Sequence, residues 1–199
     1  METTTVRFVK EADAAEILGI YTPYILDTAI TFECEIPSLE EFRKRIRDIS
    51  TDYPYIVCLM NGKIIGYAYA HRHMERRAYQ WNAELSVYID RSYLHRGVGK
   101  MLYHLLLEIL QLQNVQNVYG GITYPNENSE HLHEGLGFTR LGVYHNTGFK
   151  CGAWHDVMWF EKALGPYELE PKPFVSIKEI DKNLLEKIMN RSCVTAIPL

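Results

Sequence analysis

Residues 84–109 change from an alternating pattern of apolar residues to a helical one. Every second residue is apolar along 84–89, which predicts a strand with one buried face. Apolar residues then recur three and four positions apart along 102–109, which predicts a helix. Gly97 and Gly99 lie between the two. This stretch therefore predicts a strand, a glycine turn and a helix in direct succession.

The same patterns predict the order β-α-α-β-β-β-α-β-α-β-β along the chain as far as residue 161, with the stretch above included. Ser38 and Glu41 form a capping box at the start of the second helix, and Asn61-Gly62 favours a two-residue hairpin turn. Pro23 should end or kink the first helix. The predicted strands are 6–9, 55–60, 64–70, 79–89, 117–123, about 138–147 and 152–161, and the helices are 12–26, one starting after Ser38, one after Gly97, about 126–136 and 181–191. This order predicts an α/β fold with a mixed sheet, helices on both faces and a ligand site where strands part.

Composition limits the classes of function. With 199 residues, 47% of them hydrophobic, the chain has material for one full core. A net charge of -4 argues against a nucleic-acid partner. No apolar stretch predicts a leader or a membrane span, and the four cysteines (Cys34, Cys58, Cys151 and Cys193) form no CxxC pair, so we expect a reducing cytoplasm. The histidine pairs 71/73 and 131/133 are two residues apart, a spacing that puts both side chains on one face only in a strand. We therefore expect no helical zinc ligation by the second pair, and no metal.

The glycine turn is suited to an anion. The first turn of a helix leaves N–H groups without partners at its positive end, and His95, Arg96 and Lys100 lie beside that turn. A dinucleotide fingerprint would need glycine where Leu102 stands, and a P-loop would need Ser or Thr where Met101 stands. The residues do fit the turn that binds the pyrophosphate of acyl-CoA, Gln/Arg-x-x-Gly-x-Gly/Ala, except that Leu94 replaces the Gln or Arg. A glycine turn without a ligand is the alternative.

Several separate stretches carry a resemblance to a known family. They are TAITFE at 28–33, AYQWNAELSVYI at 78–89, HRGVGKMLY at 95–103, PNENSEHLHEGLGF at 125–138 and GFKCGAWHDVMWF at 148–160. Over residues 4–162 the chain resembles the phosphinothricin N-acetyltransferase group of the GNAT superfamily. The resemblance implies a GNAT fold with a mixed, mostly antiparallel central sheet. We expect a GNAT domain at 1–164 and a C-terminal extension at 165–199, since Gly165-Pro166 and later prolines mark the end of the compact region.

The resemblance also implies the reaction, which is transfer of acetyl from acetyl-CoA to the primary amine of a small amino-acid-like compound. Phosphinothricin, methionine sulfoximine and methionine sulfone are the acceptors of this group, and its members form homodimers. Met74 stands where the phosphinothricin enzymes carry a lysine, which weakens the case for phosphinothricin itself. We expect no nucleic-acid or membrane partner.

Glu84 is the candidate general base. It lies in a predicted strand on the face opposite Leu85, where partial burial would strengthen a carboxylate as a proton acceptor. Position alone equally allows an ion pair with Arg76 or with a histidine across the sheet. The group's glutamate at this position is regarded as the base. His133 matches the group's active-site histidine, with a role in relaying the proton or in protonating and orienting the CoA leaving group; a hydrogen-bonded structural histidine is the alternative.

The resemblance also indicates the residues that bind the two substrates. It places the donor for the oxyanion near Val87, on a strand that splays from its neighbour. Arg76 is suited to a bidentate hold on a carboxylate or phosphinate, although ordinary packing or a surface charge is the alternative for each acceptor residue. The cofactor set is Val87, Tyr88, Ile89, His95, Arg96, Gly97, Val98, Gly99, Lys100 and Asn126, and the acceptor set is Phe32, Arg76, Tyr79 and Tyr88.

Two other functions stay open at this stage. One is a GNAT enzyme for a polyamine, an aminoglycoside or a protein N-terminus, which an acidic pocket around Glu33 and Glu35 would favour. The other is a CoA-binding protein without turnover, against which the presence of both Glu84 and His133 argues.

Overall fold

The computed structural model describes residues 4–192. Its strands are β1 (Thr4–Phe8), β2 (Tyr55–Met60), β3 (Lys63–Arg72), β4 (Asn82–Ile89), β5 (Asn117–Tyr124), β6 (Thr139–Lys150) and β7 (Ala153–Ala163). Its α-helices are α1 (Ala14–Asp27), α2 (Leu39–Asp52), α3 (Val98–Leu112), α4 (Glu127–Gly135) and α5 (Lys182–Ser192), and its short 3₁₀ turns are Glu11–Asp13, Arg77–Tyr79, Arg91–Tyr93 and Ile177–Glu179. The element order expected for the α/β domain is confirmed.

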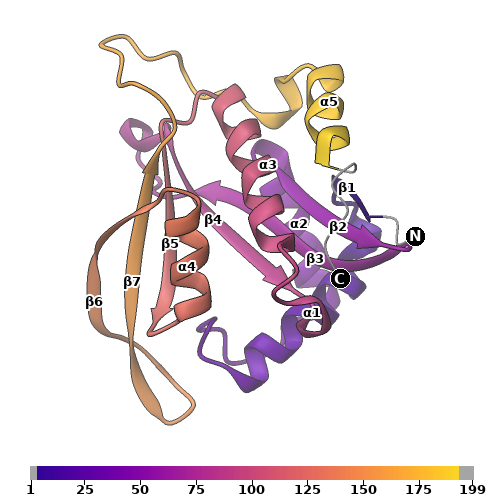
Figure 1. The fold of residues 1–199 in the computed structure, drawn as a ribbon, viewed down its shortest axis with the longest axis vertical. Helices are drawn as coiled ribbons and strands as arrows, with labels where there is room; N and C mark the ends of the chain where they lie inside the picture. The colour runs from indigo at the N-terminus through magenta and orange to yellow at the C-terminus, as the bar shows by residue number, and fades with distance from the viewer. Residues whose placement is uncertain (1–3, 193–199) are drawn as a thin grey trace.

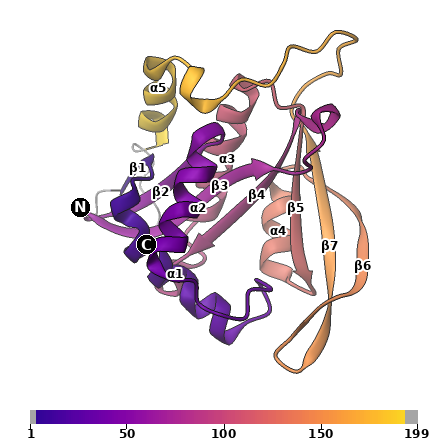
Figure 2. The same cartoon turned by 180° about the vertical axis from the view of Figure 1, so that it is seen from behind.

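The seven strands form one open sheet in the order β1-β2-β3-β4-β5-β7-β6. Every neighbouring pair is antiparallel except β4 and β5. Helices α3 and α4 lie on the face toward the viewer in Figure 1, and α2 lies on the opposite face, which Figure 2 shows. The predicted mixed, mostly antiparallel sheet with helices on both faces is therefore confirmed.

Strands β4 and β5 pair along only part of their length. The paired residues are Asn82–Glu84 with Asn117–Tyr119, and no pairing of β4 with β5 continues past Glu84 within the described sheet. Beyond this point the two strands diverge, as Figure 1 shows. Backbone groups on the facing edges are consequently left without a partner strand, at the place where the sequence predicts that strands part.

Local chemistry explains most element ends. The Ser38 hydroxyl accepts a hydrogen bond from the Glu41 N–H, and the Glu41 carboxylate accepts one from the Ser38 N–H, which completes the predicted capping box. Asn61 and Gly62 both have positive φ (51° and 84°), as a type I′ hairpin requires. The helix predicted over 12–26 is found as α1, Ala14–Asp27, with Pro23 inside it, so the proline does not end the helix. The strand expected from residue 79 begins at Asn82, after a 3₁₀ turn.

The C-terminal segment packs on the domain. Helix α5 lies beside α3 and β1 (Figure 1). Four apolar side chains of the segment belong to the main core: Ile177, Leu185, Ile188 and Met189. The boundary at residue 164 stays a prediction, but the extension shares its apolar core with the strands and helices before it.

The described residues show neither a helix that could span a membrane nor a disulfide among their cysteines. No helix within 4–192 is long and apolar enough to cross a bilayer. Cys34, Cys58 and Cys151 form no disulfide with one another, and Cys193 lies outside the described residues.

Candidate active site

The gap between β4 and β5 presents backbone donors. The Asp90 N–H donates to the Ile65 carbonyl of β3, and backbone groups of an antiparallel strand face alternate sides. Counting back along β4, the N–H groups of Val87 and Ile89 point away from β3, into the gap, whereas that of Tyr88 points toward β3. The predicted donor at Val87 is thus available to a ligand between the strands.

The first turn of α3, the helix that follows β4, has the features of an anion-binding site. Gly97 precedes α3 with φ of +78°, and the first turn of α3 carries no acidic residue. Its first N–H groups therefore face the turn without an internal partner. The Arg96 guanidinium lies 5.2 Å from the centroid of the Tyr93 ring, while His95 and Lys100 are exposed at the same end. A phosphate group here would meet backbone donors and positive charge together.

Asn126 lies at the opposite side of the gap. It is the N-cap of α4, where its side-chain oxygen accepts a hydrogen bond from the Ser129 N–H at 3.2 Å. Its amide NH₂ is left free to donate. A cavity of about 70 Å³ between β4 and β5 adjoins a second cavity of about 410 Å³, and both are lined by Ile30, Thr123 and Asn126. The gap therefore opens into a larger space under the α1–α2 loop.

Glu84 is placed at the end of the paired part of β4. Its side chain is 25% exposed, and one carboxylate oxygen, Oε2, lies 3.2 Å from Nδ1 of His73. Among residues 4–192 the other oxygen, Oε1, has no hydrogen-bond donor. The alternative reading of Glu84 as the partner of a histidine is thus correct as geometry, yet it leaves one oxygen free to accept a proton.

His133 is a buried residue of α4. Its side chain packs on Phe160 and against Gly120, and Nδ1 lies 2.7 Å from the Ser129 carbonyl. Burial lowers the pKa of this imidazole, and the hydrogen bond to Ser129 opposes the shift only in part. Nε2 is buried without a partner among the described residues. The ring is therefore neutral near pH 7, with its one proton on Nδ1.

Glu84 and His133 lie on opposite faces of the sheet. Glu84 is paired in register with Tyr119, on which the His73 ring stacks, whereas His133 lies against Gly120. Consecutive residues of a strand point to opposite faces. The two predicted catalytic side chains can approach one molecule only through the gap between β4 and β5.

The predicted acceptor residues are not gathered in one place. Phe32 packs against Gly148 of β6, and its loop is tied to the C-terminal end of β5 by a hydrogen bond from the Thr123 hydroxyl to the Ala29 carbonyl. Arg76 and Tyr79 precede the N-terminal end of β4 and are exposed. Tyr88 instead packs against two tyrosines of α1, Tyr21 and Tyr24, and against Tyr67 of β3.

Sequence reasoning missed three residues near this site. His73 contacts Glu84, His155 lines the larger cavity, and Tyr103 lies edge-on to His133 with ring centroids 5.5 Å apart. Burial raises the pKa of the Tyr103 hydroxyl, which stays protonated. His73 and His155 lie in the stretches around the motifs, but only the pairing of strands shows what each faces. No group of three or more His, Cys, Asp or Glu in the described part of the chain could hold a metal ion.

Comparison with known proteins gives the family of the chain. Residues 6–159 match the sequence profile of the family described as "Acetyltransferase (GNAT) domain". The chain is 32% identical over 177 residues to phosphinothricin N-acetyltransferase of Streptomyces viridochromogenes, an alignment that covers 88% of this chain and 95% of that protein. It is 28% identical over 166 residues to the L-methionine sulfoximine/L-methionine sulfone acetyltransferase of Salmonella typhimurium, with 80% and 94% covered.

A solved structure shows the same fold. The phosphinothricin acetyltransferase of Sinorhizobium meliloti, crystallised in complex with acetyl-CoA, superposes with a TM-score of 0.83 at 33% identity. The alignment covers 87% of this chain and 95% of that one.

Proposed function

Since the chain belongs to the GNAT acetyltransferase family, whose members use acetyl-CoA as the acetyl donor, we propose that it acetylates the amine of a small amino-acid-like compound. The acceptors named for its relatives, phosphinothricin, methionine sulfoximine and methionine sulfone, define the class. The observation that carries the proposal is a carboxylate with one free oxygen, Glu84, at the point where β4 and β5 begin to diverge.

The residues around the gap suit acetyl-CoA. The N-terminal end of α3, with Gly97, Val98 and Gly99, would hold the pyrophosphate, and the Asn126 amide would donate from the other side. The free N–H of Val87 would bind the pantetheine arm or the oxyanion, and one such donor is worth about 3 kcal/mol in the transition state. When bound, acetyl-CoA supplies the thioester that the amine attacks. Leu94 removes one side-chain contact with the pyrophosphate and leaves the backbone donors intact.

Glu84 would accept the proton of the acceptor. An amino acid's ammonium has a pKa roughly two to three units above neutral, so deprotonation costs about 3–4 kcal/mol at pH 7. Oε1 of Glu84 is free to take this proton, directly or through a water molecule. The amine can then attack the carbonyl carbon.

His133 would act on the cofactor side of the sheet. Its neutral ring has one proton, on Nδ1, which is donated to the Ser129 carbonyl, so the ring has no proton to give to a leaving thiolate. Of the predicted roles, this supports orienting the CoA leaving group through the wall of the cleft rather than protonating it.

The acceptor site would lie under the loop of Phe32, where the larger cavity adjoins the gap. Glu33 does not provide a free negative charge for a cationic acceptor, since Arg45 binds its carboxylate at 2.5 Å. Of the expected acidic pair Glu33 and Glu35, only Glu35 is without an ion pair among the described residues, which weakens the case for a polyamine or an aminoglycoside. Arg76 forms no ion pair among the described residues, but it precedes the N-terminal end of β4, whereas the larger cavity lies at the C-terminal end of the parallel strand β5. Its hold on a substrate anion stays a prediction.

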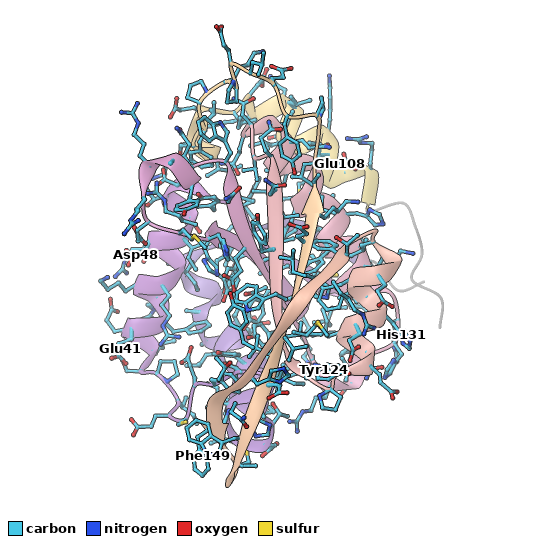
Figure 3. The ribbon with its side chains drawn as sticks, turned by 90° about the vertical axis from the view of Figure 1, so that its left-hand side faces the viewer. Glu41, Asp48, Glu108, Tyr124, His131 and Phe149 are labelled. Atoms are coloured by element: carbon cyan, nitrogen blue, oxygen red, sulfur yellow. The ribbon has the colours of Figure 1, made fainter. Side chains whose placement is uncertain are left out.

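A homodimer in the cytoplasm completes the proposal. Strand β6 ends the sheet, and its pair β6–β7 extends away from the body, with Phe149 near its far end in Figure 3. Large apolar side chains are exposed along it: Leu141, Tyr144, Phe149 and Trp154. An apolar edge strand of this length is suited to an isologous partner. Light scattering should give the mass of a dimer, and Trp154→Lys should weaken the dimer while Leu169→Lys, exposed on the C-terminal segment, should not.

Thiol release from acetyl-CoA tests the function. Wild-type protein and Glu84→Gln would be assayed with methionine sulfoximine, methionine sulfone, phosphinothricin, polyamines and aminoglycosides. We expect turnover with at least one of the first three acceptors, and a loss of about 10²-fold or more in Glu84→Gln. Binding of CoA without acetylation of any of these three would contradict the proposed acceptor class, and full activity of Glu84→Gln would contradict the base.

A further inference from the structure

His73 lies directly beside the proposed base. It follows β3, and its Nδ1 is 3.2 Å from Oε2 of Glu84, eleven residues further along the chain. Their separation along the chain does not by itself predict a contact. The antiparallel pairing of β3 with β4 brings the two residues together. This inference rests on the proposed role of Glu84.

The His73 ring is fixed by its neighbours. It stacks on Tyr119 with centroids 4.3 Å apart and planes 17° apart, and it meets Trp159 edge-on at 5.6 Å. Its side chain is only 13% exposed. Packing on two aromatic rings leaves little freedom of rotation, so Nδ1 stays aimed at Glu84.

The chemistry of the pair fixes the direction of the hydrogen bond. A carboxylate that acts as a base can only accept hydrogen bonds, so a base at Glu84 requires the ring proton of His73 to lie on Nδ1 and to be donated to Oε2. This leaves Oε1 as the oxygen that can take a proton. A base held by one oxygen keeps the other in a constant place, and a displacement of about 1 Å in a reacting group can cost about 10²-fold in rate.

We propose that His73 is a positioning residue that holds Glu84 through Nδ1–H in the orientation needed to deprotonate the acceptor amine. The neighbouring His71 offers a matched control. It is paired in register with Glu84, yet its Nδ1 lies 3.0 Å from the Arg72 carbonyl and it makes no hydrogen bond to Glu84.

Three substitutions separate the hydrogen bond from packing. His73→Phe keeps a ring on Tyr119 and removes the donor, whereas His73→Asn places an amide N–H where Nδ1 was. We expect His73→Phe to lower kcat about 10- to 100-fold with an unchanged KM for acetyl-CoA, His73→Asn to stay within about threefold of wild type, and His71→Phe to match wild type. Activity of His73→Phe equal to wild type overturns the proposal, as does an equal loss in both His73 variants.

Two further measurements distinguish this inference from the proposed function. Adding His73→Phe to Glu84→Gln should cause no further loss, because the histidine acts through the carboxylate; an additional tenfold loss overturns the proposal. NMR of ¹⁵N-labelled protein should show His73 with its proton on Nδ1 even if no acceptor on the panel is acetylated, and a proton on Nε2 alone overturns the proposal. If Glu84→Gln retains full activity, the proposed role of Glu84 as the base fails, and the role of His73 fails with it.

Discussion

At the scale of single residues, the site depends on which face of a strand each side chain occupies. Tyr119 and Gly120 are neighbours in β5, yet one lies under His73 and the other under His133. The glycine has a steric role here, since a Cβ at residue 120 would lie 2.3 Å from Nε2 of His133. The absence of a side chain at Gly120 makes room for the buried imidazole.

Gly120→Ala should therefore displace His133. The ring is enclosed by Phe160, Phe138 and Tyr103 and cannot move freely, so we expect a loss of about 1–3 kcal/mol in the free energy of unfolding and a loss of activity. Urea denaturation measures the first and thiol release the second. Gly142→Ala, where a Cβ would meet nothing within 4 Å, is the control. Equal stability of the two variants would contradict the steric role.

His133 also predicts how stability depends on pH. Because burial lowers its pKa below the ordinary 6.5, the unfolded chain takes up a proton more readily than the folded one. This contribution to stability is complete above about pH 6.5 and is lost as the pH falls toward the folded-state pKa. The midpoint temperature of thermal unfolding should decrease when the pH is lowered from 7.5 to 5.5. The decrease should be smaller in His133→Asn, which keeps a donor for Ser129 but cannot be protonated. Parallel curves for the two proteins would show that another group is responsible.

At the scale of elements, the turn before α3 combines a conformational and a chemical demand. Gly97 has φ of +78°, which a residue with a Cβ adopts only with strain. The same turn directs the first N–H groups of α3 toward the proposed pyrophosphate. A change in this turn should therefore affect stability and cofactor binding together.

Gly97→Ala should lower stability by about 1–2 kcal/mol and weaken acetyl-CoA binding, as measured by denaturation and calorimetry. Gly19→Ala is the matched control, because Gly19 lies inside α1 with open space around it and no positive φ. It should raise stability by about 0.5–1 kcal/mol and leave cofactor binding unchanged. Wild-type affinity in Gly97→Ala would argue against the turn as the pyrophosphate site.

At the scale of the whole molecule, the C-terminal segment completes the core. Leu185 is 6% exposed and packs in the main core, whereas its neighbour Leu184 is 40% exposed. The segment lies beyond the residues that match the GNAT family profile, which end at 159. The fold of this chain therefore includes a stabilising element outside the family domain.

Leu185→Ala should cost about 2–5 kcal/mol in the free energy of unfolding, and Leu184→Ala much less. A chain ending at residue 164 should lose several kcal/mol, since each fully buried Leu, Ile or Met contributes about 1.5–3 kcal/mol. Thermal unfolding of the three variants measures these differences. Wild-type stability of the truncated chain would instead indicate that residues 1–164 fold independently.

The sequence by itself determined the order of elements and the glycine turn before α3, because both depend on local patterns. Apolar period, the Ser38 capping box and Asn61-Gly62 act within a few residues. The apolar pattern also predicted that the first helix extends past Pro23, and α1 ends at Asp27. Only the tertiary structure decided that Glu84 meets His73, and that His133 lies on the other face. These contacts depend on strand register and on the point where β4 and β5 stop pairing, which no local pattern encodes.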